Sequence, residues 1–350
     1  MRRTMSFLRA VIGAVRSARH TPRLAAGLVP DDDVLLDAPD ERLAPALVAA
    51  ALADPEPAAK LLATTRDAAE WEDRDRYVTR LATFAYNRGD WLAHWLAITP
   101  HDPDAVLVSA QLAVRRAWES PARAERLREL DPLIRTITEE APHDPVPWRL
   151  ALDHARGAHA GHTVFETLWE QAVRRSPHHY GSHVAALKYL SAQWYGSHRA
   201  AFDFAEQAAD DAAPDSLVRA LPVRAAYDRL RALPRPDRSA AAARLDRAAD
   251  RALALSAVFP AGDPWPAEVR NLLAYVLVER ARWEEALDEF RRIGAHATSF
   301  PWGARQGAVQ EDPLRRFLAV RDVVRAESAG RTPLWRPGDG RAGRGGPGGH

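Results

Sequence analysis

From Asp40 to about Glu327 the chain consists of one expected helix after another, and this pattern constrains the fold more than any other feature. Apolar residues recur three and four positions apart, as on the buried face of an amphipathic helix, and no alternating strand pattern lasts longer than a few residues. In the segment 161–175 the apolar stripe consists of Val164, Phe165, Leu168, Trp169, Ala172 and Val173. A further helix is expected from Tyr180, and its apolar face extends to Trp194.

Proline and its neighbours mark where these helices begin and end. Pro177 follows two arginines that fit the last turn of a helix. Asp144-Pro145 and Asp102-Pro103 fit helix starts, because aspartate caps free backbone N–H groups and proline needs no hydrogen bond in the first turn. Helices of about 10 to 20 residues joined by short loops are typical of an α-solenoid. We therefore predict an all-α fold, a solenoid of antiparallel helix pairs over residues 31–329.

The two ends of the chain differ from this body in charge. Residues 1–30 contain six arginines and no acidic residue, and from Arg331 onward four arginines accompany Asp339 alone. Because the whole chain has a net charge of +1, these basic ends leave the body at about −8. A mildly acidic body argues against a nucleic-acid partner along the stack.

Residues 5–19 predict a basic amphipathic helix, with arginines opposite an apolar face. Arg9 and Arg16 interrupt the apolar stretch that a signal peptide needs. The helix either docks on the body or lies on a membrane surface, and a start at Met5 instead of Met1 would remove two of its arginines. The tail 330–350, rich in Gly, Arg and Pro, is expected to be disordered, since it buries too little apolar surface to offset its ordering entropy.

The sequence lacks the signatures of several enzyme classes. It contains no cysteine, which excludes disulfides and cysteine nucleophiles and fits the reducing cytoplasm, where we expect the protein. Its only lysines, Lys60 and Lys188, lie outside any phosphate-loop motif, and neither a G-x-S-x-G nor an H-E-x-x-H motif occurs. The longest apolar run, 43–53, is too short to span a membrane and contains Pro45. We expect a protein without a cofactor and without enzymatic activity.

The stretch from Val269 to Gly294 combines small and aromatic residues at positions that fit two short helices. These residues are Ala274, Trp283, Ala286 and Phe290. The stretch resembles a single tetratricopeptide repeat, in which a small residue on each helix allows close approach and an aromatic residue covers the turn. Arg270 stands where the repeat has its first aromatic residue, and the closing proline is missing. The resemblance implies a tetratricopeptide-like helix pair.

A longer stretch, from Trp91 to Tyr227, contains a second pattern. Its most distinctive residues are Trp148, Phe165, Trp169, Trp194, Gly196 and Ser197. It resembles an uncharacterised bacterial family, a domain of unknown function related to tetratricopeptide proteins, in which a Trp-Gly-Gly-Ser turn joins two helices. Tyr195 stands where that family has its first glycine. The resemblance implies the fold and transfers no catalytic residue.

Histidines cluster in the middle of the chain. They are His154, His159, His162, His178, His179, His183 and His198. His179 and His183 lie four residues apart, a spacing that on a helix directs both imidazoles to the same side, as a metal pair requires. A third ligand would have to come from His198 or Asp203.

A structural role for these histidines is the interpretation we favour. In that case they cap helix ends and pack against Tyr180 and Trp194. The acidic run Asp31-Asp32-Asp33 also lacks a metal signature, because it has neither the glycine nor the distal glutamate of a calcium loop. We expect it to form a polar connection before the first body helix.

The eleven tryptophans lie mostly at helical spacing beside leucine and valine, which indicates core packing. Trp91, Trp95 and Trp302 are the least constrained by their neighbours in sequence, and we expect them to be exposed and to line a groove.

Three functions are compatible with these patterns. The favoured hypothesis is a helical scaffold whose groove binds an unidentified protein or peptide, since stacked helix pairs create an extended surface. One alternative is an enzyme with a metal site around His179, His183 and His198. The other is a peripheral membrane protein attached through residues 5–19.

Overall fold

The computed structural model describes residues 26–232, 242–303 and 312–331. Within these ranges the chain forms 17 α-helices, two short 3₁₀ helices and one sheet of two strands with two residues each. The predicted all-α fold class is therefore confirmed. The predicted basic helix at 5–19 and nearly all of the predicted disordered tail lie outside the described residues.

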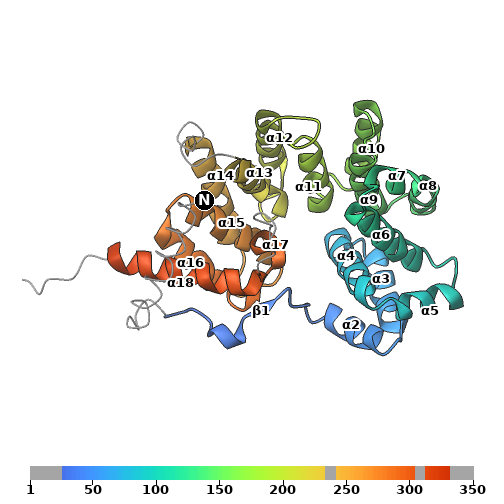
Figure 1. Ribbon diagram of the computed structural model, residues 1–350, viewed down its shortest axis with the longest axis horizontal. Coiled ribbons are helices and arrows are strands. Elements are labelled where there is room, and N and C mark those ends of the chain that lie inside the picture. Colours follow the sequence, from blue (N-terminus) through green and yellow to red (C-terminus); the bar gives the residue numbers. More distant parts are fainter. Residues whose placement is uncertain (1–25, 233–241, 304–311, 332–350) are drawn as a thin grey trace, which may run out of the picture.

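The first half of the chain forms the helices on the right of Figure 1. They are α2 (Leu43–Ala51), α3 (Glu56–Asp67), α4 (Trp71–Asn87), α5 (Asp90–Ile98), α6 (Pro103–Glu119), α7 (Arg123–Arg128), α8 (Asp131–Glu140), α9 (Pro145–Gly157) and α10 (His162–Arg175). As predicted, Asp102 and Asp144 cap α6 and α9, each accepting hydrogen bonds from the first backbone N–H groups of its helix.

The second half continues over the top and down the left of the same view. Its elements are α11 (Tyr180–Tyr189), α12 (His198–Asp211), the 3₁₀ helix η2 (Leu217–Ala220), α13 (Leu221–Ala232), α14 (Ala242–Ser256), α15 (Ala267–Glu279), α16 (Trp283–Ile293), β2 (His296–Ala297), α17 (Ser299–Trp302) and α18 (Pro313–Arg331). The helix expected from Tyr180 is shorter than predicted, because it ends at Tyr189 and leaves Trp194 in the following turn.

Helices that follow one another in sequence pack side by side. The pairs α2–α3, α9–α10, α12–α13 and α15–α16 all make extensive contacts. The apolar core follows the stack as three successive clusters, within residues 43–158, within 152–204 and, joined by Val34, within 184–324. This arrangement is a solenoid that curves into an arc (Figure 1).

The turn between α11 and α12 explains the Gly-Ser pair of the sequence motif. A Cβ atom on Gly196 would lie 2.2 Å from the carbonyl oxygen of Leu190, so only glycine fits there. Ser197 caps α12 by accepting a hydrogen bond from the backbone N–H of Ala200. The ring of Tyr195 stacks on that of Tyr189, with centroids 4.7 Å apart.

The predicted repeat at 269–294 corresponds to α15 and α16. Ala274 and Ala286 are both fully buried in this pair. Ala281 forms the turn with a left-handed φ of 57°, and Trp283 begins α16 directly after it. Arg270 is also fully buried, and its guanidinium donates hydrogen bonds to carbonyl oxygens such as those of Ser256 and Phe259.

Residues 26–40, here called the strap, cross the open side of the arc (Figure 1). The strap contains the 3₁₀ helix η1 (Asp31–Asp33) and the strand β1 (Leu35–Leu36), which pairs in parallel with β2. Asp31 pairs with Arg321 of α18, and Val34 is buried in the C-terminal core. The acidic run 31–33 is therefore the expected polar connection, and it also joins the first helices to the last.

Helix α4 contacts several other helices through charged side chains. Arg74 is almost fully buried and donates to Asp104 of α6 at 2.6 Å, to Asp144 of α9 at 2.5 Å and to the carbonyl oxygen of Leu62 of α3 at 2.9 Å. One guanidinium thus joins four helices and satisfies two buried carboxylates.

Replacing Ala286 by leucine is predicted to destabilise the protein by about 1–3 kcal/mol, because a larger side chain would push α15 and α16 apart. Ala281→Leu is the matched control, since Ala281 is exposed and already has a Cβ in the left-handed conformation. Urea unfolding of both variants measures the difference. A neutral Ala286→Leu beside a severe Ala281→Leu would show that the assigned pairing is wrong.

Replacing Arg74 by methionine is predicted to cost about 3–5 kcal/mol, because it leaves Asp104 and Asp144 buried with one counter-ion fewer. The control is Arg126→Met, which removes an exposed ion pair with Glu129 and is expected to change stability by less than about 0.5 kcal/mol. Equal midpoints in thermal unfolding for the two variants would contradict the proposed role of Arg74.

Candidate functional site

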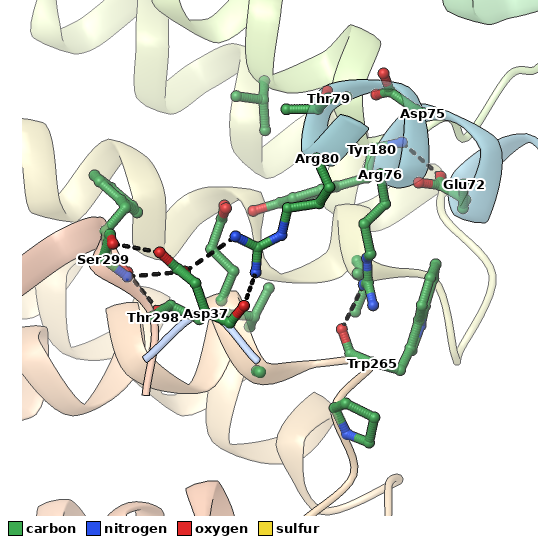
Figure 2. A pocket seen from close by; sticks show the side chains of 18 of the residues that line it. Asp37, Glu72, Asp75, Arg76, Thr79, Arg80, Tyr180, Trp265, Thr298 and Ser299 are labelled. Carbon is green, nitrogen blue, oxygen red and sulfur yellow. Dashed lines mark hydrogen bonds and ion pairs between the residues drawn. The ribbon is translucent and has the colours of Figure 1, made fainter. Parts of the chain in front are cut away.

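A cavity lined by many polar residues lies inside the arc, where the two halves of the chain meet. Its volume is about 480 Å³, and residues of α4, α9, α11, α13, α15 and the strap line it. The segments 264–269 and 296–300 complete the wall. Figure 2 shows the part of this wall around α4.

Helix α4 supplies one side of the cavity. Arg76 donates a hydrogen bond of 2.7 Å to the carbonyl oxygen of Trp265, and its guanidinium lies 4.1 Å from the centroid of that indole ring (Figure 2). Arg80 donates to the carbonyl oxygen of Asp37 in the strap at 3.0 Å. Glu72 accepts the backbone N–H of Tyr180 at 2.7 Å, where burial raises its pKa. These contacts join α4 to α11, to the strap and to the segment before α15.

Most charged side chains in the cavity are paired with one another. Arg149 of α9 pairs with Asp75 of α4, and Arg224 of α13 pairs with Glu268 of α15 at 2.6 Å. Burial alone would raise the pKa of Asp153, but nearby cations, Lys188 first among them, lower it to about 2. Asp153 and Glu268, whose pKa values are both lowered, are therefore ionised near neutral pH and already have arginine partners.

Lys188 is the exception among the cavity cations. It is half-buried on α11, and within the described part of the chain it has neither a hydrogen bond nor an ion pair. Burial lowers its pKa, against the opposing effect of Asp153. Gln111 Oε1 and Arg149 Nε belong to residues that line the cavity, but both atoms are themselves buried and have no partner in the described ranges. Lys188 is therefore the half-buried group at the wall whose hydrogen-bonding capacity the fold does not use.

The candidate metal ligands His179, His183 and Asp203 make hydrogen bonds or ion pairs within the fold. His179 is fully buried and caps α11, where its Nδ1 accepts from the backbone N–H of Ser182. His183 hydrogen-bonds the carbonyl oxygen of His179 at 3.0 Å, and burial lowers its pKa to about 4. Asp203 is exposed and pairs with Arg244 at 2.5 Å, and His198 is the first residue of α12. No group of three His, Asp or Glu side chains in the described ranges is arranged to hold a metal ion.

The expected capping role is therefore confirmed for His179, but the expected aromatic partners are wrong for His183. His183 packs against Trp169 and Phe204, with ring centroids 5.1 and 6.1 Å away. Trp194 instead contacts His159, at 5.8 Å between centroids.

The three tryptophans expected to line a groove are all buried, so that prediction is wrong. Trp91, Trp95 and Trp302 are 1%, 3% and 0% exposed. Trp302 packs against Phe290 and donates its Nε1–H to Asn271 Oδ1 at 2.8 Å. Contacts with residues distant in sequence bury these rings, and neighbours in sequence do not reveal such contacts.

The two tryptophans of the longer motif are structural. Trp148 on α9 lies under the guanidinium of Arg175, 4.2 Å from its ring centroid. Trp194 packs edge-on against Trp118, and Arg156 lies within 4.9 Å of both ring centroids. These arginine–aromatic contacts hold the helix ends together on the face outside the cavity.

Comparisons of the chain with protein-family models, with curated proteins and with solved structures found no match. None of the helices in the described ranges is both long and apolar enough to cross a membrane.

Replacing His179 by alanine is predicted to destabilise the protein by about 0.5–2 kcal/mol, because the first turn of α11 loses its cap. His178→Ala, at the exposed preceding position, is the control and should be nearly neutral. Thermal unfolding measures both, and metal analysis of the wild type accompanies it. One bound metal ion per chain that disappears in His179→Ala would contradict the structural role and support the metal-enzyme alternative.

Proposed function

We propose that this protein is a non-enzymatic helical scaffold that binds an extended peptide segment of a partner protein in the cavity between its two halves. The observation that carries the proposal is the cavity inside the arc, in whose wall Lys188 has neither a hydrogen bond nor an ion pair within the described ranges. Buried polar groups cost free energy unless a partner satisfies them, and a bound ligand can be that partner.

The size and lining of the cavity suit a short stretch of peptide. Ligand sites typically have volumes of a few hundred cubic ångströms, and an extended chain advances about 3.3 Å per residue. Each peptide unit brings one N–H donor and one carbonyl acceptor. Besides its charged groups the cavity is lined by Thr79, Thr83, Gln111, Thr298 and Ser299. The hydroxyl groups of Thr83, Thr298 and Ser299 already donate hydrogen bonds within the fold, so these three side chains offer a peptide their acceptor capacity.

The strap provides an intramolecular example of an extended segment at the cavity rim. The backbone N–H groups of Leu35 and Asp37 each donate 2.8 Å hydrogen bonds, to the carbonyl oxygens of Ala295 and Ala297. Asp37 also accepts the backbone N–H of Ser299 at 3.0 Å (Figure 2). The rim therefore already accommodates one extended acidic segment through backbone pairing and side-chain contacts.

We also propose that the fold is related to tetratricopeptide repeats. The support is the pair α15–α16, in which Ala274 and Ala286 are buried and Trp283 stands at the turn. This relationship favours a partner-binding role, because stacked helix pairs create a continuous concave surface.

Peptide-library selection on the immobilised protein tests the binding role. Thr79 is exposed on α4 and lines the cavity, so Thr79→Trp is expected to fill part of the space and weaken selected peptides at least about tenfold. Thr136→Trp, at an exposed position of α8 outside the cavity, is the matched control and should bind as the wild type does. Failure to select any peptide, or selected peptides that bind equally to both variants, would refute a peptide site in the cavity.

A further inference from the structure

Two observations bear on the chemistry of the bound segment: the position of Lys188 in the cavity wall, and the absence of a direct ion pair to its ammonium group in the described structure. From these we propose that the segment carries a carboxylate that binds the ammonium group of Lys188. This inference rests on the proposed peptide-binding function and specifies its partner as an acidic peptide.

Lys188 occupies the face of α11 that borders the cavity. Tyr180 and Val184 precede it by two turns and one turn, and all three line the cavity, as expected for residues four apart on one helix face. The ammonium group is therefore held at the wall by a helix and not by a loop.

Two of the three acids near Lys188 already have other partners. Asp153 interacts with Arg156 at 2.9 Å and with Arg149 at 3.6 Å. Glu268 accepts from Arg224 at 2.6 Å. Asp228 of α13 is the remaining nearby acid, where burial raises its pKa, and the described structure contains no ion pair between it and Lys188. The ammonium is thus close to carboxylates without being paired to one.

Lys188 offers three N–H donors at the cavity wall, and none of them has a partner in the described ranges. Gln111 Oε1 and Arg149 Nε also lack partners, but both atoms are buried beneath the wall. A carboxylate has two acceptor oxygens and no donor, and a hydrogen bond between two charged groups is about twice as strong as a neutral one. The lining as a whole has six carboxylates and five cations, so the complementarity is local: an acidic group suits the ammonium of Lys188 better than an amide or a hydroxyl group does.

Lys188 also imposes a cost that the fold alone does not explain. The half-buried ammonium loses hydration and gains no hydrogen bond in the described structure, and its attraction to Asp153 offsets only part of that loss. If Lys188 served stability, its replacement by an apolar residue of similar length would weaken the protein. If it serves binding, the same replacement should leave the melting temperature equal or higher while binding is lost.

The test uses three fluorescein-labelled peptides and the full chain. The probes are hexaglutamate with an amidated C-terminus, hexaglutamine with an amidated C-terminus, and hexaglutamine with a free C-terminal carboxylate. We expect hexaglutamate to bind the wild type at least about tenfold more tightly than amidated hexaglutamine in fluorescence anisotropy. The third probe distinguishes a terminal carboxylate from a side-chain carboxylate as the anchoring group.

The variants separate this site from the basic ends of the chain. Lys188→Met should abolish the preference for hexaglutamate without lowering the melting temperature, and Lys188→Arg should retain the preference. Lys60→Met is the matched control, because Lys60 is exposed outside the cavity and is the only other lysine. In acetylation with a succinimidyl ester, hexaglutamate should protect Lys188 and leave Lys60 unprotected.

Two results would overturn the inference, and they separate it from the proposed function. If the wild type binds amidated hexaglutamine as tightly as hexaglutamate and Thr79→Trp weakens both, the cavity binds peptides but Lys188 does not select a carboxylate. If Lys188→Met keeps the preference for hexaglutamate, the carboxylate binds elsewhere. If Thr79→Trp weakens no probe and no library peptide, the peptide-binding function itself is wrong.

Discussion

The structure depends on one helix whose charged residues all point to distant parts of the chain. Between positions 72 and 80, α4 contacts α3, α6 and α9 through Arg74, the segment before α15 through Arg76, and the strap through Arg80. Breaking a buried ion pair costs several kcal/mol, although replacing the whole pair by apolar residues is often neutral. These contacts therefore define which segments lie together more than they add net stability. The cavity lies where α4 contacts segments from both halves of the arc.

Local sequence patterns predicted where the helices lie in the sequence. They did not predict which distant segments each helix contacts. The caps at Asp102 and Asp144, the turn at Gly196-Ser197 and the pair α15–α16 all depend on residues within a few positions of one another. Arg74 and its acidic partners are 30 and 70 residues apart, and Arg76 and Trp265 are 189 apart, so no local pattern connects them. Buried arginines such as Arg74 and Arg270 hold distant segments of this fold together. Trp91, Trp95 and Trp302 were wrongly predicted to be exposed for the same reason, because residues distant in sequence cover them.

The cations in the cavity wall differ in whether they have a carboxylate partner. Arg149 and Arg224 have carboxylate partners and position the helices around the cavity. Lys188 has no such partner and lies in the same wall. The sequence singled out Lys188 only as one of two lysines, because its significance depends on which acids around it are already paired. Under the proposed function, leaving Lys188 without an ion pair would give up some stability for a specific contact with the partner.

Hydrogen exchange in the wild type and in Arg76→Met tests most directly whether α4 joins the two halves. Arg76 reaches the C-terminal half through the carbonyl oxygen and the ring of Trp265. If this contact holds the cavity wall together, amides of residues 263–270 should exchange faster in the variant, although they are far from the substitution in sequence. A change confined to α4 and its neighbours in sequence, with unchanged exchange at 263–270, would contradict the account.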